Sequence, residues 1–559
     1  MPCVRSLVRM RTGVACKLAH RWPVIGSCLE KVCSKYAVLP ALTVFEVEGP
    51  DWHASCVIIG QRFLIAKIQW GGVKVTLKTV KDYEDSLRQL NIKVYMFGER
   101  VTNFVDHPII RPSINSVGKT YELAADGEHQ SLMTAVSSLT GETINRFTHL
   151  HQNAEDLVLK VQMQRLLGQK TASCFQRCVG MDAMTALDSV TFEMDHRLGT
   201  VYHQRFRQYL RYVQENDLVC DGAMTDPKGD RSLRPNQQED PDLYLHITGE
   251  NAEGITVRGA KAHQTGALNS HEVIVMPTMA MTADDKDYAV SFALPSDAPG
   301  IIYIYGRQSC DTRKLEGSPM DVGNPNYGGQ EALVVFEDVF VPWDRVFMCR
   351  EYEFSGTLVE RFAGYHRQSY GGCKVGVGDV LIGAAAMMAE YNGSSKASHI
   401  KDKLIEMCHL NETLYACGIA CSSLGHPTPS GTYLIDLLLA NVCKQNVTRF
   451  PYEMTRLAED ITGGLMVTMP SEKDFRHPEI GKYIDKYLKG VAQVPTEHRM
   501  RMLRLVENLT LGCAAVGYRT ESMHGAGSPQ AQRVMIARQA NVEHKKKLAR
   551  VIAGIEKEA

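Results

Sequence analysis

The stretch Gly364-Tyr-His-Arg-Gln-Ser-Tyr-Gly-Gly-Cys-Lys374 lies in the second half of the chain, where a helical sequence period returns after a β-rich middle part. His366, Tyr370 and Lys374 follow one another at four-residue spacing, so a helix places all three side chains on one side. His366 and Cys373 form the pair His366-x6-Cys373, which is half of a possible set of four iron ligands. An imidazole and a thiolate are both competent ligands for iron.

The other half of this set lies in Lys170-Thr-Ala-Ser-Cys-Phe-Gln-Arg-Cys-Val-Gly180, as the pair Cys174-x3-Cys178. Three thiolates and one imidazole could hold an iron–sulfur cluster whose potential and open coordination differ from those of an all-cysteine site. Spacing alone does not decide this, because cysteines at i and i+4 simply share one face of a helix. Two small buried thiols and a hydrogen-bonded core histidine fit the same pattern.

Three changes of sequence period divide the chain. With 559 residues it exceeds the usual limit of a single core, so roughly two to four domains are expected. Helical spacing runs from Asp82 to about Leu218, with Ala154–Leu167 and Cys174–Met194 as the clearest segments. We expect an N-terminal extension over residues 1–80, a helical domain over 81–218, a β-barrel or sandwich domain over 219–350 and a helical bundle over 351–559.

The middle part consists of short β-rich runs separated by turn residues, which indicates an antiparallel barrel or sandwich. These runs begin at Asp242, Gly254, Glu272, Tyr288, Gly300 and Ala332. Long helical segments follow at Val375–Tyr391, Ser398–Leu424, Tyr433–Ile461, Glu497–Tyr518 and Gln530–Ile555. Pro451 is expected to kink or break the third of them. Long helices with short connections predict an antiparallel bundle, and the fold class is therefore α+β.

The composition excludes several classes of protein. Hydrophobic residues make up 44% and charged residues 22%, as in an ordinary globular protein. A formal net charge of −1 predicts neither a nucleic acid nor an anionic membrane as partner. No uninterrupted apolar run reaches the ~18 residues that span a bilayer. The 16 cysteines lie mostly in apolar segments, which favours a reducing compartment.

The N-terminal segment differs from the rest. No acidic residue precedes Glu30, while basic residues alternate with apolar ones at Arg5, Arg9, Arg11, Lys17 and Arg21. This composition is typical of a mitochondrial transit peptide, so we expect a mitochondrial location, with the cytoplasm as the alternative. A basic tail or a mistranslated upstream segment has the same composition. Within residues 54–80, two short strands and a turn at Gly71-Gly72 are expected.

The sequence segments around the four possible ligands resemble those of a known family. Together with Ala223-Met-Thr-Asp-Pro-Lys-Gly-Asp-Arg-Ser232 and Glu521-Ser-Met-His-Gly-Ala-Gly-Ser-Pro-Gln530, they resemble the acyl-CoA dehydratase branch of the 4-hydroxyphenylacetate 3-hydroxylase family of flavoproteins. The resemblance runs from about Lys81 to the C-terminus and does not cover residues 1–80. It implies FAD and an acyl-CoA dehydrogenase-like architecture. The dehydratase branch also carries a [4Fe-4S] cluster, which the hydroxylases lack, so the set of four ligands separates the two branches.

The resemblance also implies roles for the ligands. Cys174, Cys178 and Cys373 match thiolate ligands, and His366 matches the imidazole ligand. Histidine is a neutral and weaker donor than thiolate, so its iron is the natural place for a substrate oxygen to bind. A displaced imidazole can accept a proton near neutral pH.

The expected catalytic or substrate-orienting residues are named by the same match. They are His366, Tyr370, Lys374, Gln176, Glu331 and Glu521. Without the resemblance, Tyr370 and Lys374 fit a hydrogen-bonded phenol and a snorkelling amine. The two glutamates equally fit solvated surface carboxylates, and Gln176 is a candidate hydrogen-bond donor to cluster or substrate.

Flavin contacts are expected mainly from the β domain. One polar loop has backbone amides and basic side chains that could meet flavin or pyrophosphate oxygens, and a short polar segment after a strand could hydrogen-bond the flavin ring. A glycine pair at the end of a bundle helix could reach the FAD of a neighbouring subunit, although a plain helix cap has the same sequence. These candidates are Thr225, Asp226, Pro227, Lys228, Gly229, Asp230, Arg231 and Ser232; His263, Gln264 and Thr265; and Gly463 and Gly464. No Gly-x-Gly-x-x-Gly motif is present, which fits FAD bound outside a Rossmann fold.

The expected reaction is the dehydration of 4-hydroxybutyryl-CoA to crotonyl-CoA, with isomerisation of vinylacetyl-CoA. The dehydration removes a proton from an unactivated β carbon, which a one-electron route makes far more acidic; flavin supplies single electrons and iron acts as a Lewis acid. The alternative is an aromatic 3-monooxygenase that uses FADH2 and no iron, and a further one is a flavoprotein assembly subunit. A homotetramer is expected, because the long apolar helices are hard to cover in one chain.

Overall fold

The structure is a computed structural model that describes residues 42–49, 52–59, 62–70 and 77–556. The chain separates into two compact units, Met1–Val75 and Thr76–Ala559. In the first unit, strands β1 (Leu42–Gly49), β2 (Trp52–Ile59) and β3 (Arg62–Trp70) form an antiparallel sheet in the order β1-β2-β3. The strands expected within residues 54–80 are confirmed. The expected turn at Gly71-Gly72 and the basic segment before residue 30 lie outside the described residues.

The second unit begins with helices, as the sequence period predicted. They pack around the buried residues of a large apolar core that continues into the sheets. These helices are α2 (Val80–Arg88), α3 (Arg111–Ala125), α4 (Gln130–Met133), α5 (Ala154–Thr171), α6 (Cys178–Leu198) and α7 (Tyr202–Glu215). The short strands β4 (Val94–Met96), β5 (Glu99–Val101), β6 (Thr134–Val136) and β7 (Thr143–Asn145) lie between them.

Two sheets follow, and their strands are β8 (Cys220–Ala223), β9 (His246–Glu250), β10 (Gly254–Thr265), β11 (Glu272–Val275), β12 (Val290–Pro295), β13 (Ile301–Tyr305), β14 (Glu331–Pro342) and β15 (Val346–Cys349). The larger sheet has the order β5-β4-β13-β14-β10-β9 and the smaller one β15-β12-β11-β8. The rings of Phe292 in β12 and Phe336 in β14 meet edge to face at 6.1 Å, which joins the two sheets.

The expectation of a purely antiparallel β domain is wrong at two positions. Strand β4 pairs with β13 in parallel, and β8 pairs with β11 in parallel. Both β4 and β8 leave the helical part of the chain and enter a sheet at a distance from their partners in sequence. A parallel pair needs such a long connection, whereas hairpin connections favour antiparallel pairs. The second unit is compact as a whole, and the domain boundaries expected at residues 81, 219 and 351 within it stay a prediction.

The C-terminal part is helical, with α8 (Pro319–Val322) inserted earlier between the strands. Its helices are α9 (Tyr352–Tyr391), α10 (Ser398–Ser423), α11 (Leu437–Val447), α12 (Phe450–Thr462), α13 (Glu472–Phe475), α14 (Gly481–Tyr487), α15 (Thr496–Thr510), α16 (Cys513–Ala515), α17 (Glu521–His524), α18 (Pro529–Gln539) and α19 (Val542–Ile552). The break expected near Pro451 is confirmed, because this proline lies in the first turn of α12. The last two segments are also broken: a π-helical turn (Val516–Thr520) follows α16, and Asn541 with φ 43° separates α18 from α19.

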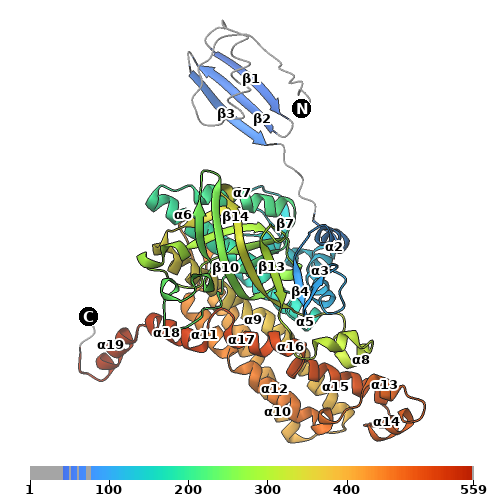
Figure 1. Ribbon diagram of the computed structural model, residues 1–559. Coiled ribbons are helices and arrows are strands. Elements are labelled where there is room, and N and C mark those ends of the chain that lie inside the picture. The colour runs from blue at the N-terminus through green and yellow to red at the C-terminus, as the bar shows by residue number, and fades with distance from the viewer. Residues whose placement is uncertain (1–41, 50–51, 60–61, 71–76, 557–559) are drawn as a thin grey trace. The chain divides into compact units, whose positions relative to one another are not determined.

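Helix α9 is the central element of the C-terminal part. It packs against α5, α6, α10, α11, α12 and α15, and Figure 1 shows α9, α11 and α17 below the strands β10, β13 and β14 in this view. An 18-residue window of α9 has a mean hydropathy of 1.4, which meets the length and composition of a membrane-spanning helix. However, 67% of that window is buried against the rest of the protein, so α9 has the surroundings of a core helix.

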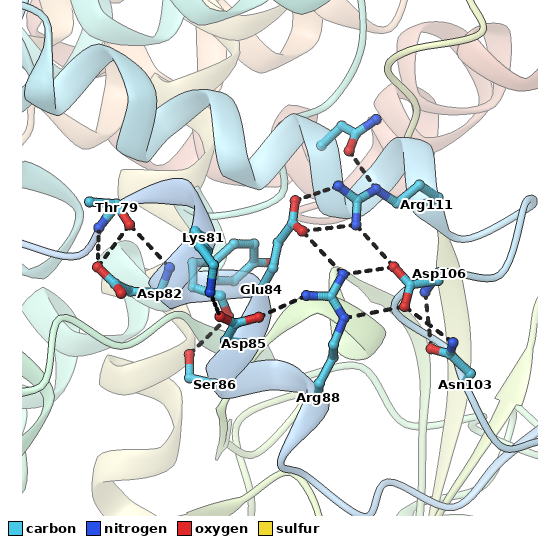
Figure 2. A network of polar contacts seen from close by, with 12 residues as sticks. Thr79, Lys81, Asp82, Glu84, Asp85, Ser86, Arg88, Asn103, Asp106 and Arg111 are labelled. Atoms are coloured by element: carbon cyan, nitrogen blue, oxygen red, sulfur yellow. Dashed lines mark hydrogen bonds and ion pairs between the residues drawn. The ribbon is translucent and has the colours of Figure 1, made fainter.

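A network of ion pairs ties the first helix of the second unit to α3 (Figure 2). Arg88 in α2 bonds Asp106 at 2.7 Å and Asp85 at 3.0 Å, while Arg111 in α3 bonds Glu84. The network is largely exposed, and exposed ion pairs contribute about 0.2–1 kcal/mol each. It therefore orients α2 on the surface, while the buried Tyr83 and Leu87 anchor the helix in the core.

Close approach of α5 and α9 depends on glycine. A Cβ atom at Gly376 would collide with the carbonyl oxygen of Arg165 in α5, and one at Gly168 would lie 2.8 Å from the carbonyl oxygen of Cys373. Contacts this short do not occur between real Cβ atoms and backbone, so these helices touch through their backbones. The possible ligand Cys373 thus lies where α9 is held most tightly against α5.

We predict that Gly376→Ala lowers the free energy of unfolding by about 1–3 kcal/mol or more, because the helices must move apart. Gly383→Ala is the matched control, since Gly383 is in the same helix and has open space around it. The control is expected to keep or raise stability by up to about 1 kcal/mol, because alanine favours helix. Urea unfolding followed by circular dichroism checks both. Equal stability of the two variants would contradict the packing argument.

Candidate active site

Cys174 does not lie on the helix that the sequence predicted for it. Helix α6 begins at Cys178, and Cys174 lies in the turn between α5 and α6. Ala172 caps α5 with φ 48° and Gln176 adopts φ 56°, both in the left-handed region. These residues reverse the chain, so the two thiols belong to a turn and a helix start rather than to one helical face. Backbone strain of this kind occurs mostly where the surrounding structure fixes it, often at functional sites.

The possible ligands come together despite their separation in sequence. Cys178 and Cys373 belong to one buried apolar cluster that also contains Tyr370 and Phe175. Burial raises the pKa of the Cys174 thiol to about 12 and that of Cys373 to about 11. The pKa of Cys178 is raised well above its usual value by burial and by the neighbouring Cys174 and Cys373. Without a bound cation, all three are therefore neutral thiols at pH 7.

His366 faces the same place from α9. Its Nδ1 atom is 2.9 Å from Oδ2 of Asp182 in α6, one helical turn after Cys178. Its ring stacks on Phe362 at 5.9 Å and meets the ring of Tyr370 edge to face at 5.2 Å. The imidazole is therefore held by two ring contacts and through Nδ1, and Nε2 remains for a ligand or a proton.

A buried carboxylate joins Tyr370 and Lys374. The Tyr370 hydroxyl donates to Oε1 of Glu521 at 2.8 Å, and Lys374 Nζ donates to Oε2 of the same group at 2.5 Å and to the Gly517 carbonyl at 2.7 Å. Lys374 and its hydrogen bonds hold the pKa of Glu521 below its usual value in spite of burial. Glu521 is thus a partnered internal carboxylate, and Lys374 is a buried ammonium rather than a snorkelling amine.

Glu331 and Gln176 lie at the β-domain side. Thr265 donates to Oε2 of Glu331 at 2.5 Å, and burial raises the pKa of Glu331 well above its usual value. Gln176 is fully buried, donates to the carbonyl of Gln330 at 2.6 Å and accepts from Asn269 at 2.8 Å. Burial favours the neutral acid form of Glu331, while Gln176 mainly fixes the loop that carries Cys174.

Only some residues of the polar loop 225–232 are available to contact a cofactor. Asp226 is buried in an ion pair with Lys261 at 2.9 Å and accepts from the backbone of Leu245, so its carboxylate anchors the loop and does not face a cofactor. Lys228 adopts φ 78° and is half-buried. Thr225 is half-buried, and Pro227, Gly229, Asp230, Arg231 and Ser232 are exposed. Asp230 caps the turn through Ser232, so the basic side chains and backbone amides remain for an anion.

The expected polar segment His263-Gln264-Thr265 forms the end of β10 rather than following it. A register shift between Lys261 and Gln264 accompanies the left-handed backbone of His263 at φ 58°. The pKa of His263 is lowered by burial and by the nearby Lys228 and His524. His263 of the β domain thus lies near His524, which is in the same helix, α17, as Glu521.

Gly463 and Gly464 lie at the end of α12 and not in the β domain. Gly463 caps α12 with φ 83°, and both glycines are exposed with open space around them. Within one chain they form a plain helix cap. A contact with a cofactor of another subunit remains a proposal.

Sequence reasoning missed two lysines and an aspartate. Lys444 in α11 donates to the carbonyl of Ser522, and its Nζ lies 5.1 Å from the centroid of the Tyr370 ring, as does Nζ of Lys374. Asp182 holds His366 and pairs with Lys160. The spacing Cys178-x3-Asp182 could have indicated the aspartate, but a lysine in an amphipathic helix looks like a surface residue.

The donor set fits an iron–sulfur cluster. Three neutral thiols packed together with an imidazole whose Nδ1 is held by a carboxylate match the ligands and outer hydrogen bond of such a centre. A bound cation deprotonates a coordinating thiol, which offsets the raised pKa values. For a flavin, Gln330 is fully buried beside Gln176 and Glu331, and its side-chain amide makes no hydrogen bond to any residue that the structure describes. An amide in this position fits a polar ring edge.

Comparison with known proteins agrees with this geometry. The model of the family "4-hydroxyphenylacetate 3-hydroxylase N terminal" matches residues 79–348, and that of its C-terminal counterpart matches residues 355–554. The 4-hydroxybutyryl-CoA dehydratase/vinylacetyl-CoA-Δ-isomerase of Clostridium aminobutyricum is 67% identical over 488 residues, covering 86% of this chain and all of the relative. The oxygenase component of 4-hydroxyphenylacetate 3-monooxygenase from Thermus thermophilus is 25% identical, covering 78% of this chain and 88% of the relative.

Solved structures also match most of this chain. An oxygen-tolerant archaeal 4-hydroxybutyryl-CoA dehydratase from N. maritimus has a TM-score of 0.85 at 60% identity, covering 86% of this chain and 96% of its own. A 4-hydroxyphenylacetate 3-monooxygenase oxygenase component complexed with FAD has a TM-score of 0.76 at 23% identity, covering 85% of this chain and 98% of its own, and shares the fold. The mixed helix-and-sheet fold is therefore confirmed.

The expected mitochondrial location is wrong. The close relatives come from a bacterium and an archaeon, which lack mitochondria. A basic segment without acidic residues arises in other ways, so its composition alone was not specific.

The buried Lys444 predicts a pH-dependent stability. Burial, together with the charges of Lys374 and Arg367, lowers its pKa from 10.5 to about 7. Between these values the unfolded chain holds a proton that the native state lacks, so the contribution of Lys444 to stability rises with pH in this window. We expect the wild type to gain up to about 1.4 kcal/mol per pH unit relative to Lys444→Met between pH 7 and 9.

Urea unfolding at pH 7, 8 and 9 measures this difference. Lys401→Met, at an exposed lysine of α10, is the control and is expected to follow the wild type at every pH. A constant difference between wild type and Lys444→Met would show that Lys444 does not titrate in this range.

Proposed function

The chain belongs to the 4-hydroxyphenylacetate 3-hydroxylase family, and we propose that it is a lyase that dehydrates 4-hydroxybutyryl-CoA to crotonyl-CoA and isomerises vinylacetyl-CoA. One observation carries this proposal: three thiols, two buried and that of Cys174 half-buried, gather in the site with a held imidazole, from parts of the sequence about 190 residues apart. The relative that is 67% identical has the same two activities in its name. The monooxygenases are distant relatives, and their reaction gives no role to four iron ligands.

The cofactors proposed are FAD, which the family members with bound FAD support, and a [4Fe-4S] cluster held by Cys174, Cys178, Cys373 and His366. When bound, FAD supplies and recovers single electrons and the cluster acts as a Lewis acid on the substrate hydroxyl. An acyl-CoA dehydrogenase-like architecture is the finer fold assignment that we propose, because helical, β and helical parts follow one another in that order.

The reaction sets a proton balance that the protein must meet. The substrate loses hydroxide from C4 and one proton each from C2 and C3, and C4 gains one proton. One of the two removed protons therefore leaves with hydroxide as water, and the other returns to carbon. The isomerisation of vinylacetyl-CoA moves one proton from C2 to C4 and loses no water. Both reactions thus share one proton transfer, so the same groups can serve them.

Two groups of residues can handle these protons. Nε2 of His366 is free because Nδ1 is engaged by Asp182, so His366 is the proposed proton acceptor beside the leaving hydroxyl. The Tyr370 hydroxyl, bonded to the ionised Glu521, is the second candidate. Lys374 keeps Glu521 charged. Glu331, whose pKa is raised by burial, can donate a proton or a hydrogen bond to the thioester.

The test is an anaerobic purification in which iron, acid-labile sulfide and FAD are measured per subunit, followed by turnover of 4-hydroxybutyryl-CoA. We predict that Cys174→Ser loses iron. His366→Cys is expected to keep its iron, because thiolate is a competent ligand, and to lose dehydration, because a tightly bound thiolate neither yields to substrate nor serves as a base. Turnover per iron near the wild-type value in His366→Cys would assign proton abstraction to another residue. A wild type with FAD but no iron would favour the monooxygenase.

We also propose a homotetramer, or dimer of dimers, with FAD at a subunit boundary. Helix α19 stands clear of the body in Figure 1 and has no buried residue, yet exposes Val542, Leu548 and Ile552. Such an apolar face is typical of a subunit contact. Analytical ultracentrifugation is expected to give four chains per particle, and a monomer that keeps FAD stoichiometrically would contradict this.

A further inference from the structure

Two fully buried charges lie behind His366. Lys160 in α5 and Asp182 in α6 are both 0% exposed, and Lys160 Nζ is 2.5 Å from Oδ1 of Asp182. Lys160 also donates to the carbonyl of Tyr365 at 3.0 Å and to Oε1 of Gln368 at 2.9 Å, both in α9. All three protons of the ammonium group are therefore used. Burying a charge costs several kcal/mol unless it is paired and fully hydrogen-bonded, as this one is.

The second oxygen of Asp182 faces His366. Oδ2 accepts from Nδ1 of His366 at 2.9 Å and from the Ser369 hydroxyl at 3.3 Å. A carboxylate paired with a lysine can only accept hydrogen bonds, so Nδ1 must carry the proton. The imidazole is then the tautomer whose Nε2 has a free lone pair. This is the tautomer that can bind iron or take up a proton.

The arrangement couples the two halves of the ligand set. Asp182 follows Cys178 by one turn of α6, so the helix that supplies a thiol also orients the imidazole of α9. Lys160 reaches across from α5 to both helices. One buried ion pair thus fixes the mutual position of α5, α6 and α9 at the site.

We propose that Asp182, held by Lys160, is a positioning residue that fixes the ring of His366 and the tautomer whose Nε2 is free to ligate iron. This inference rests on the proposed function. Carboxylate partners of ligating histidines commonly act this way, and their loss costs about 10- to 100-fold in metal affinity or activity.

Asp182→Asn tests the tautomer directly. The ammonium group of Lys160 needs an acceptor, so the amide oxygen of the new side chain turns to Lys160 and its NH2 group faces His366. Nδ1 must then accept a hydrogen bond, and the imidazole proton moves to Nε2, where it blocks ligation. We expect about 10- to 100-fold weaker iron retention against a chelator, with a comparable loss of turnover per iron.

Pulsed EPR of the reduced cluster gives a readout that a general loss of stability does not move. The wild type is expected to show hyperfine coupling to a ligating imidazole nitrogen, and Asp182→Asn is expected to lose it. Ser369→Ala removes the other hydrogen bond to the same oxygen and leaves the His366 contact intact. This control is expected to keep the coupling and to retain turnover within about twofold, because that bond is long and weak.

A double variant covers the case in which Asp182→Asn does not fold because Lys160 is left without a counter-charge. Lys160→Met with Asp182→Asn removes both charges, and methionine donates no hydrogen bond. The amide oxygen is then free to accept from Nδ1, so the nitrogen coupling is expected to return. Normal coupling and turnover in Asp182→Asn, or a double variant that folds without the coupling, would overturn the inference. A wild type that takes up no iron would overturn both this inference and the proposed function.

Discussion

The burial of one polar stretch in α9 constrains the rest of the structure. Every residue from Gly364 to Lys374 is buried, and the stretch includes the basic side chains of His366, Arg367 and Lys374. Buried polar groups are tolerated only when they are partnered. Each neighbouring element therefore supplies a partner: Asp182 of α6 for His366, Glu521 of α17 for Lys374, and the carbonyl of Ala526 for Arg367. The packing of the helices around α9 is thus also the construction of the site.

The backbone contacts and the polar contacts depend on each other. Gly376 lets α9 touch α5 through the backbone, and Lys160 of α5 can then reach Asp182 and the carbonyl of Tyr365 without exposure to water. If the helices lay a side chain farther apart, water could enter and compete for these groups. The close approach therefore keeps the ion pair dry, and a dry ion pair orients the imidazole more strictly than a solvated one does.

The sequence predicted the parts of the site that depend on local spacing. His366, Tyr370 and Lys374 fall on one side of a helix because their four-residue spacing follows the helical period, and the structure confirms this helix. The turn that holds Cys174 was predicted as helix, because cysteines four residues apart satisfy a helical pattern. The left-handed backbone of Gln176 depends on the hydrogen bonds to Gln330 and Asn269, which lie far away in sequence. Helix propensity is a local property of the sequence, so it does not include the effect of such distant contacts.

The buried lysines mark a further limit of sequence reasoning and a difference in chemistry. Lys374 and Lys444 lie at equal distances from the ring of Tyr370, and burial lowers the pKa of both, yet their net pKa shifts are opposite. Lys374 is bonded to Glu521, which keeps its pKa above the usual value, whereas Lys444 bonds a neutral carbonyl and its pKa falls to about 7. Lys374 is therefore a permanent cation beside Tyr370, whose hydroxyl stays protonated because burial and the nearby Glu521 raise its pKa well above the usual value. Lys444, in contrast, can take up or release a proton near pH 7. One difference between the two amines is the direct contact with the carboxylate of Glu521, which hydrogen-bonds Lys374 and acts on Lys444 only from a distance.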